Sequence, residues 1–115
     1  MTAEDCVFCG IASGAIPAPR LHEDADCVVV ADSAPKAPVH LLILPKEHLR
    51  SSDGVDGAKE RLVGHLVRVA AQMARVRGLD ATGYRLVFNH GAEAGQTVFH
   101  LHLHLLGGRP LGAMG

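Results

Sequence analysis

The stretch Val98-Phe99-His100-Leu101-His102-Leu103-His104-Leu105-Leu106 decides how this chain folds, because histidine and leucine alternate along it. Successive side chains of a β-strand point to opposite faces of a sheet. The alternation therefore predicts a strand over residues 98–106, with the three histidines on one face and the leucines directed into the core.

Three imidazole side chains on one face are compatible with a polar surface row, a metal site or chemistry at phosphorus. A reaction at phosphorus needs a nucleophile with a lone pair, donors for the non-bridging oxygens and an acid for the leaving group. Histidines two residues apart can divide these tasks, the central one attacking while its neighbours donate. A surface row explains strict alternation poorly, and the other two uses stay open at this point.

The composition predicts a single folded domain over residues 1–115. Hydrophobic residues make up 48% of the 115 residues and charged residues 20%, as in ordinary globular proteins. The net charge of -1 provides no broad basic surface, so we expect no nucleic-acid polymer as a partner, while a single nucleotide remains possible. No apolar run approaches the roughly 18 residues of a membrane span. The odd count of 3 cysteines favours reduced thiols or a metal site, and we expect a cytoplasmic protein without membrane contact.

Sequence patterns predict five strands and two helices. A short helix over residues 5–14 has Asp5 to cap its start and Gly14 to end it. Strands are expected near 20–23, 27–32, 39–44, 84–88 and 98–106. A long helix over 58–77 has one apolar face, formed by Leu62, Leu66, Val69, Met73 and Val76. With short connections, these elements predict an α+β domain: a five-stranded antiparallel sheet with both helices to one side.

Several motifs together identify a resemblance that covers almost the whole chain. The histidine strand matches His-x-His-x-His-x-x with apolar x, the signature of the histidine triad superfamily. Further matching segments are Cys6-Val7-Phe8-Cys9, Ile16-Pro17, Asp32, Pro38-Val39-His40, Pro45-Lys46-Glu47-His48, Asn89-His90-Gly91, Gly95-Gln96-Thr97-Val98 and Gly107-Gly108-Arg109. With these, the chain resembles the Hint-like branch, the purine nucleoside phosphoramidate hydrolases.

The resemblance implies a homodimer whose sheets join edge to edge, with a small-molecule purine nucleotide as the partner of each subunit. The reaction it implies is cleavage of the P–N bond of purine nucleoside 5′-phosphoramidates or related adenylated compounds. His102 would be the nucleophile and form a nucleotidyl-histidine intermediate. The implied catalytic set is His102, His104, His40 and His100.

The resemblance also implies which residues hold the nucleotide. Asp32 would accept hydrogen bonds from the ribose hydroxyls. The phosphate would be held by Asn89, Gln96 and Thr97, and the Gly95-Gln96-Thr97 backbone could itself offer N–H groups to an anion. The walls of the base pocket would be Phe8, Ile11, Ile16 and Val30.

The pair Cys6-x-x-Cys9 predicts a metal site only in combination with histidines. A tetrahedral zinc site needs four ligands, and His48 with one histidine of the strand could complete a Cys2His2 set. Zinc-bearing members of the superfamily use the first triad histidine, so the resemblance implies structural zinc on Cys6, Cys9, His48 and His100. A zinc-bound His100 could not donate a proton, and leaving-group protonation would fall to His104, His40 or solvent.

Other functions remain compatible with the same sequence. They are hydrolysis of dinucleoside polyphosphates, nucleotidyl transfer, and nucleotide binding as an interaction module with incidental hydrolysis. Ala31 and Ser33 beside Asp32 differ from many relatives, and the C-terminal tail lacks the tryptophan of some members. These departures leave the preference between adenine and guanine open.

Overall fold

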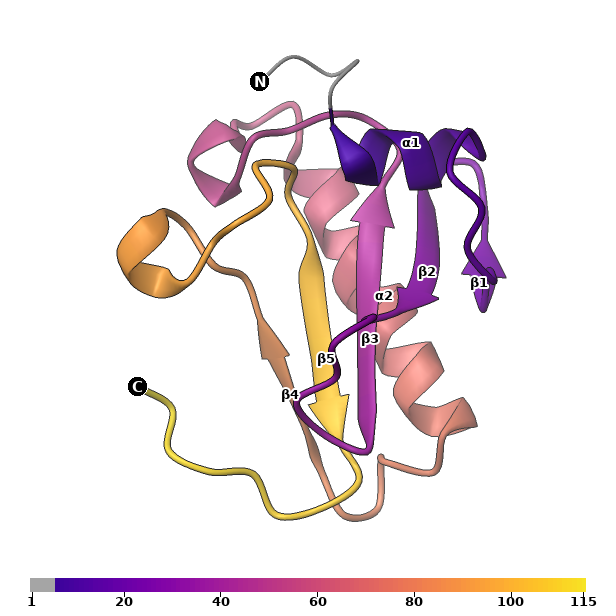
Figure 1. Cartoon of the computed structure of the whole chain (residues 1–115), viewed down its shortest axis with the longest axis vertical. Helices are drawn as coiled ribbons and strands as arrows, with labels where there is room; N and C mark the ends of the chain where they lie inside the picture. The colour runs from indigo at the N-terminus through magenta and orange to yellow at the C-terminus, as the bar shows by residue number, and fades with distance from the viewer. Residues whose placement is uncertain (1–5) are drawn as a thin grey trace.

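A computed structural model of the chain describes residues 6–115, with one antiparallel sheet in the order β1-β2-β3-β5-β4 (Figure 1). The strands are β1 His22–Glu23, β2 Cys27–Ala31, β3 Val39–Pro45, β4 Tyr84–Val87 and β5 Leu103–Gly107. The helices are α1 Val7–Ser13 and α2 Glu60–Val76, with 3-10 turns η2 Ser52–Gly54 and η3 Ala92–Ala94. The five-stranded α+β architecture is the predicted one.

The two helices lie on opposite faces of the sheet, so the prediction that both cover one side was wrong. On one face α2 packs Leu66 and Val69 against side chains that include Val29 and Ile43. On the other face a smaller core joins α1 to the strands, and its buried members are Ala12, Val28, Val30, Leu42 and Leu44. The reason is that β2 and β3 are apolar at nearly every position, so both of their faces need cover.

The buried stripe of α2 differs from its prediction at the end of the helix. Val76 is 76% exposed, whereas Ala70 and Ala74 are buried beside Leu66 and Met73. Val76 is the last residue of α2 and lies at the edge of the stripe, so small alanines take the inner positions instead. Among the described residues, no helix is both long and apolar enough to cross a membrane.

The histidine segment is a regular strand only in its second half. The prediction placed a strand over residues 98–106, but β5 begins at Leu103, which pairs with Ile43. Before Leu103 the chain runs beside the loop after β3 instead of pairing with β3. There the Leu101 N–H donates to the Leu49 carbonyl at 2.5 Å. The side-chain alternation nevertheless persists, since Leu101, Leu103 and Leu105 are buried in the α2 core.

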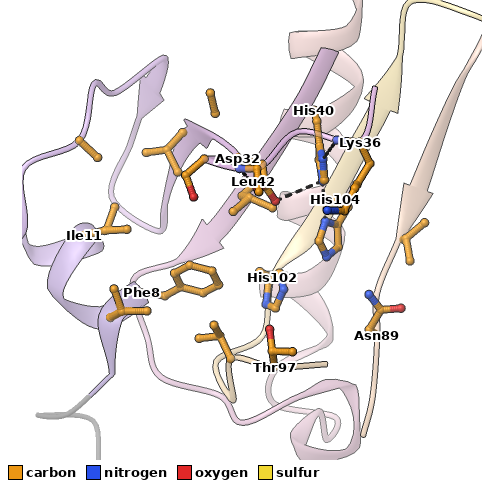
Figure 2. Close-up of a pocket in the computed structure, with 18 of the residues that line it drawn as sticks. Phe8, Ile11, Asp32, Lys36, His40, Leu42, Asn89, Thr97, His102 and His104 are labelled. Atoms are coloured by element: carbon orange, nitrogen blue, oxygen red, sulfur yellow. Dashed lines mark hydrogen bonds and ion pairs between the residues drawn. The ribbon is translucent and has the colours of Figure 1, made fainter. Parts of the chain in front are cut away.

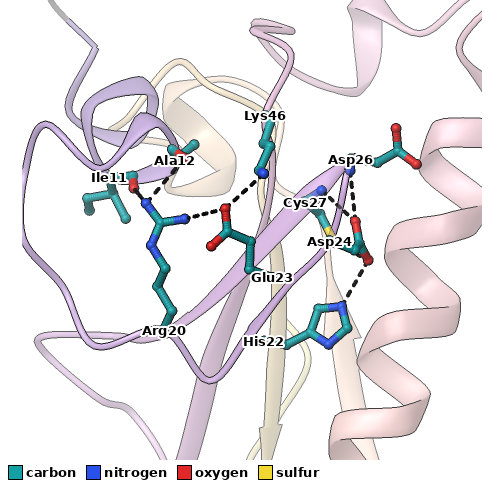
Figure 3. A network of polar contacts seen from close by, with 9 residues as sticks. All are labelled: Ile11, Ala12, Arg20, His22, Glu23, Asp24, Asp26, Cys27 and Lys46. Atoms are coloured by element: carbon teal, nitrogen blue, oxygen red, sulfur yellow. Dashed lines mark hydrogen bonds and ion pairs between the residues drawn. The ribbon is translucent and has the colours of Figure 1, made fainter.

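A polar network fixes α1 and the β1–β2 turn (Figure 3). Gly14, in the left-handed region at φ 89°, ends α1, and the Ile11 carbonyl accepts from both the Gly14 N–H and Arg20 Nη2, the latter at 2.9 Å. Arg20 also pairs with Glu23 at 2.9 Å. The start of α1 is capped by Cys6, whose sulfur accepts from the Cys9 N–H at 3.3 Å. The predicted cap, Asp5, lies outside the described residues.

Candidate active site

A cavity of about 1060 Å³ opens on the α1 side of the sheet and receives side chains from widely separated parts of the chain (Figure 2). One part of its wall is apolar and includes Phe8, Ile11, Val30 and Leu42. The polar part consists of Asp32, Ser33, Lys36, His40, Asn89, Thr97, His102 and His104. Such a division suits a ligand with an apolar group at one end and a polar group at the other.

His102 is held as a neutral imidazole with a defined tautomer. Its Nδ1 lies 2.7 Å from the carbonyl oxygen of His100. A carbonyl oxygen can only accept, so Nδ1 carries the proton and Nε2 keeps a free lone pair. Burial lowers the pKa of His102 below its usual range, although this hydrogen bond and Asp32 oppose the effect. The side chain is therefore an uncharged base with its lone pair at Nε2.

A chain of hydrogen bonds makes His104 a hydrogen-bond donor at Nε2, where His102 is an acceptor. The Lys36 backbone N–H donates to His40 Nδ1 at 3.0 Å, so the proton of neutral His40 is on Nε2. His40 Nε2 then donates to His104 Nδ1 at 2.9 Å. His104 must accordingly carry its own proton on Nε2, which makes this atom a donor. Burial first, and then His102 and His40, lower the pKa of His104 to about 4.

Asp32 is the carboxylate of the cavity. It follows β2, where its N–H donates to the His40 carbonyl at 2.9 Å, and its Oδ1 accepts from the Ala34 N–H at 2.8 Å. The other oxygen, Oδ2, lies 3.4 Å from His40 Nε2. Burial lowers the pKa of His40, and the charge of Asp32 opposes this shift. Asp32 thus joins the histidines at the boundary between the apolar and polar walls.

The structure brings most of the sequence-predicted nucleotide residues to this cavity. Its wall includes Phe8, Ile11, Val30, Asp32, Asn89, Gly95 and Thr97 together with His40, His102 and His104. Ile16 is not in the wall, since it is 40% exposed and its side chain lies over Gly10 of α1.

Gln96 is also absent from the wall, because its side chain holds the loop before the histidines. Its Nε2 donates to the carbonyls of Arg50 at 3.0 Å and Val98 at 3.3 Å. Its Oε1 accepts from the Gly91 N–H at 2.8 Å. The predicted contact of this side chain with phosphate would require breaking these bonds.

Lys36 is a cavity residue that the sequence analysis missed. Its backbone N–H sets the His40 tautomer, and its carbonyl accepts from Arg109 Nη2 at 2.9 Å. A backbone group leaves no signature in the residue type. The loop between Pro35 and Pro38 was the only signal that this segment is held in a defined shape.

The four residues predicted to bind metal converge beside the cavity. Cys6, Cys9, His48 and His100 place their ligand atoms within 4.8 Å of one another. His48 Nδ1 and His100 Nδ1 are 3.2 Å apart, and Cys9 Sγ lies 3.2 Å and 3.3 Å from them. A tetrahedron with zinc bond lengths has edges of about 3.3 Å between nitrogens and about 3.5 Å between nitrogen and sulfur.

A hydrogen bond outside the cluster orients His100 as a metal ligand. His100 Nε2 donates to the Pro45 carbonyl at 2.9 Å, which leaves the Nδ1 lone pair facing the cysteines. Burial lowers the pKa of His100, so its imidazole is neutral. Burial, followed by the neighbouring Cys6, raises the pKa of Cys9 to about 11. Two cysteine sulfurs and two imidazole nitrogens at these distances fit a tetrahedral soft or borderline cation.

Comparisons with known proteins agree with this architecture. The chain is 38% identical over 112 residues to the purine nucleoside phosphoramidase of Escherichia coli, covering 97% of this chain and 94% of that protein. A HIT family hydrolase from Legionella pneumophila has a similar crystal structure, with a TM-score of 0.92, 44% identity and coverage of 94% and 96%.

A third relative was solved with metal. It is a Zn-bound histidine triad family protein from Mycobacterium smegmatis, 35% identical, with a TM-score of 0.82 and coverage of 94% of this chain and 78% of that one. The sequence model of the HIT domain matches residues 13–111, which include β1 to β5, α2 and all three alternating histidines. The chain therefore belongs to the HIT domain family.

Proposed function

We propose that this protein is a nucleotide hydrolase that cleaves the P–N bond of purine nucleoside 5′-phosphoramidates or related adenylated compounds. The observation that carries the proposal is the pair of tautomers in the cavity: a lone pair on His102 Nε2 and a proton on His104 Nε2. The 38% identity to the phosphoramidase of Escherichia coli supports this substrate class.

The proposed reaction has two displacements at phosphorus. His102 Nε2 attacks the α-phosphorus, an N–P bond forms, and the P–N bond to the leaving amine breaks with its electron pair going to the amine. The amine takes up one proton from solvent, while the neutral His104 donates a hydrogen bond from Nε2 to a non-bridging phosphate oxygen. Water then attacks phosphorus, the bond to His102 breaks, one proton is released, and the nucleoside monophosphate leaves.

The walls of the cavity suggest how the nucleotide binds. The apolar wall of Phe8, Ile11 and Val30 can take the purine, and Asp32 can accept from the ribose hydroxyls. Asn89 and Thr97 line the cavity beside the histidines and can donate to phosphate oxygens. This arrangement brings the α-phosphorus next to His102.

We also propose that Cys6, Cys9, His48 and His100 hold a structural zinc ion. The donor distances and the Zn-bound relative support the metal. When bound, zinc would link the start of α1 to the histidine segment. His100 would then be unavailable as an acid, and the roles in the reaction would stay with His102 and His104.

The chain is further proposed to form a cytoplasmic homodimer. β4 is an edge strand of the sheet, and Tyr84 on it is 38% exposed, so two copies can pair along this edge. None of the three cysteines, all of which lie in the described part of the chain, forms a disulfide, as expected in a reducing compartment.

Replacement of the nucleophile tests the proposed reaction. We expect His102→Ala to lower kcat with an adenosine phosphoramidate by roughly 10⁴-fold or more, while the variant still binds AMP in calorimetry. His90→Ala is the matched control, because His90 is exposed and lies outside the cavity wall. Full activity of His102→Ala would reject the mechanism, and faster turnover of dinucleoside polyphosphates than of phosphoramidates by the wild type would reject the substrate class.

The acid side of the pH profile tests the neutral nucleophile. Because the pKa of His102 is lowered, His102 stays neutral below the ordinary value of about 6.5. Single-turnover rates should therefore stay constant as pH falls to 6.5 and decline only further below it. Titration of the His102 ring by NMR should have its midpoint in the same lower range. A midpoint at or above the ordinary value would contradict the burial argument.

Elemental analysis tests the zinc site. Protein purified without chelator should contain one zinc per chain, and Cys9→Ser should lose it and unfold at a lower temperature. Cys27→Ala should keep the metal, because Cys27 is buried in the α2 core and lies outside the four-residue cluster. Wild-type protein without zinc, or equal zinc in the two variants, would count against this assignment.

A further inference from the structure

We propose that Phe8 is a positioning residue for His102: its ring packs edge-to-face against the imidazole and holds Nε2 toward the cavity. This inference rests on the proposed function, in which His102 is the nucleophile. It gives Phe8 a role beyond that of an apolar wall for the base.

The contact between the two rings is close and well oriented. The ring centroids of Phe8 and His102 are 4.9 Å apart with an interplanar angle of 76°. This is the T-shaped arrangement that aromatic pairs prefer. Phe8 also meets the His100 ring at 6.1 Å and 86°, so it sits over the start of the histidine segment. Figure 2 shows the Phe8 ring between Ile11 and His102.

His102 needs such a contact because its hydrogen bond fixes only one ring atom. The Nδ1–H bond to the His100 carbonyl leaves the imidazole able to tilt about this anchor, and the second torsion of histidine is intrinsically broad. The His104 ring lies 4.9 Å away at 61°, and it is anchored in turn by His40. Phe8 and His104 thus bound the His102 ring, each at a steep angle to its plane.

The backbone of Phe8 is held from both ends of α1. Cys6 and Cys9 flank it, and both approach His100 Nδ1, at 3.4 Å and 3.3 Å. At the other end Arg20 holds the Ile11 carbonyl. A ring carried by a seven-residue helix fastened at both ends can restrict its neighbour more firmly than one on a loop.

Ile11 provides the comparison that separates positioning from base binding. It lies one turn after Phe8 on α1 and lines the same cavity, but the ring contacts of His102 are with Phe8 and His104. Removing side-chain volume at Ile11 should therefore weaken nucleotide binding and act mainly on KM. Removing the ring at Phe8 should slow the attack on phosphorus.

The test measures nucleotidylation of His102 by rapid quench in single turnover with saturating adenosine phosphoramidate. We expect Phe8→Leu and Phe8→Met to lower this rate about tenfold, as a small misplacement of a reacting group does, with a much smaller change in AMP affinity. Phe8→Tyr keeps the ring and should restore the rate. Ile11→Ala should show the reverse pattern, with a raised KM.

A spectroscopic readout distinguishes positioning from a loss of packing. In NMR relaxation of the ring C–H bonds, both ring-removing variants should show a more mobile His102 ring than the wild type, while the Nδ1–H tautomer set by the His100 carbonyl persists. A wild-type rate, or a His102 ring as rigid as in the wild type, in a folded Phe8→Leu or Phe8→Met variant would overturn the inference while leaving the proposed function intact. Absence of a His102 adduct in the wild type would instead reject the proposed function.

Discussion

The hydrogen bond from His102 Nδ1 to the His100 carbonyl is the constraint on which the chemistry of this cavity depends. Imidazole is useful as a nucleophile only when its free nitrogen faces the reacting atom and stays unprotonated. The 2.7 Å bond selects the nitrogen, and burial keeps the ring neutral. Both conditions are set by the fold before any ligand arrives, so reorganisation at the moment of reaction is small.

A chain of hydrogen bonds sets the tautomer of His104, whose Nε2 carries the proton. It begins at a backbone N–H of the loop after β2, passes through His40 and ends on β5. The loop is in turn held from the C-terminal tail by Arg109. His102 and His104 are neighbours on one face, yet His102 offers an acceptor and His104 a donor at Nε2. The reason is that Nδ1 of His102 donates to the His100 carbonyl, whereas Nδ1 of His104 accepts from His40.

Helix α1 connects the cavity to the Cys/His cluster. α1 carries two cluster ligands, the Phe8 ring and part of the apolar cavity wall within seven residues and their cap. A change in how α1 is fastened would therefore reach the cavity through Phe8. This linkage gives a physical reason for the proposed structural metal to lie apart from the proposed nucleophile.

Local patterns predicted the elements of the fold, whereas most of the cavity wall was predicted only through the resemblance to the histidine triad superfamily. Alternation predicted the histidine face correctly, because the period of side-chain direction survives where the strand itself is irregular. The start of β5 at Leu103 was not predictable, since it depends on where β3 and its following loop leave the sheet.

Other features depend on tertiary contacts that leave no local pattern. The position of α1 on the face opposite α2 follows from β2 and β3 being buried on both sides. The role of the Lys36 N–H belongs to the backbone. The resemblance implied that Gln96 holds phosphate, but its side-chain amide bonds Gly91 of its own loop and Arg50 of the loop after β3.

The most direct test of the account is to trap the covalent intermediate and locate it. Wild-type protein mixed with an adenosine phosphoramidate, quenched in alkali within milliseconds and digested, should contain a nucleotidylated peptide whose fragment spectrum places AMP on His102. Steady turnover with no adduct at any quench time, or an adduct on His100 or His104 instead, would contradict the account.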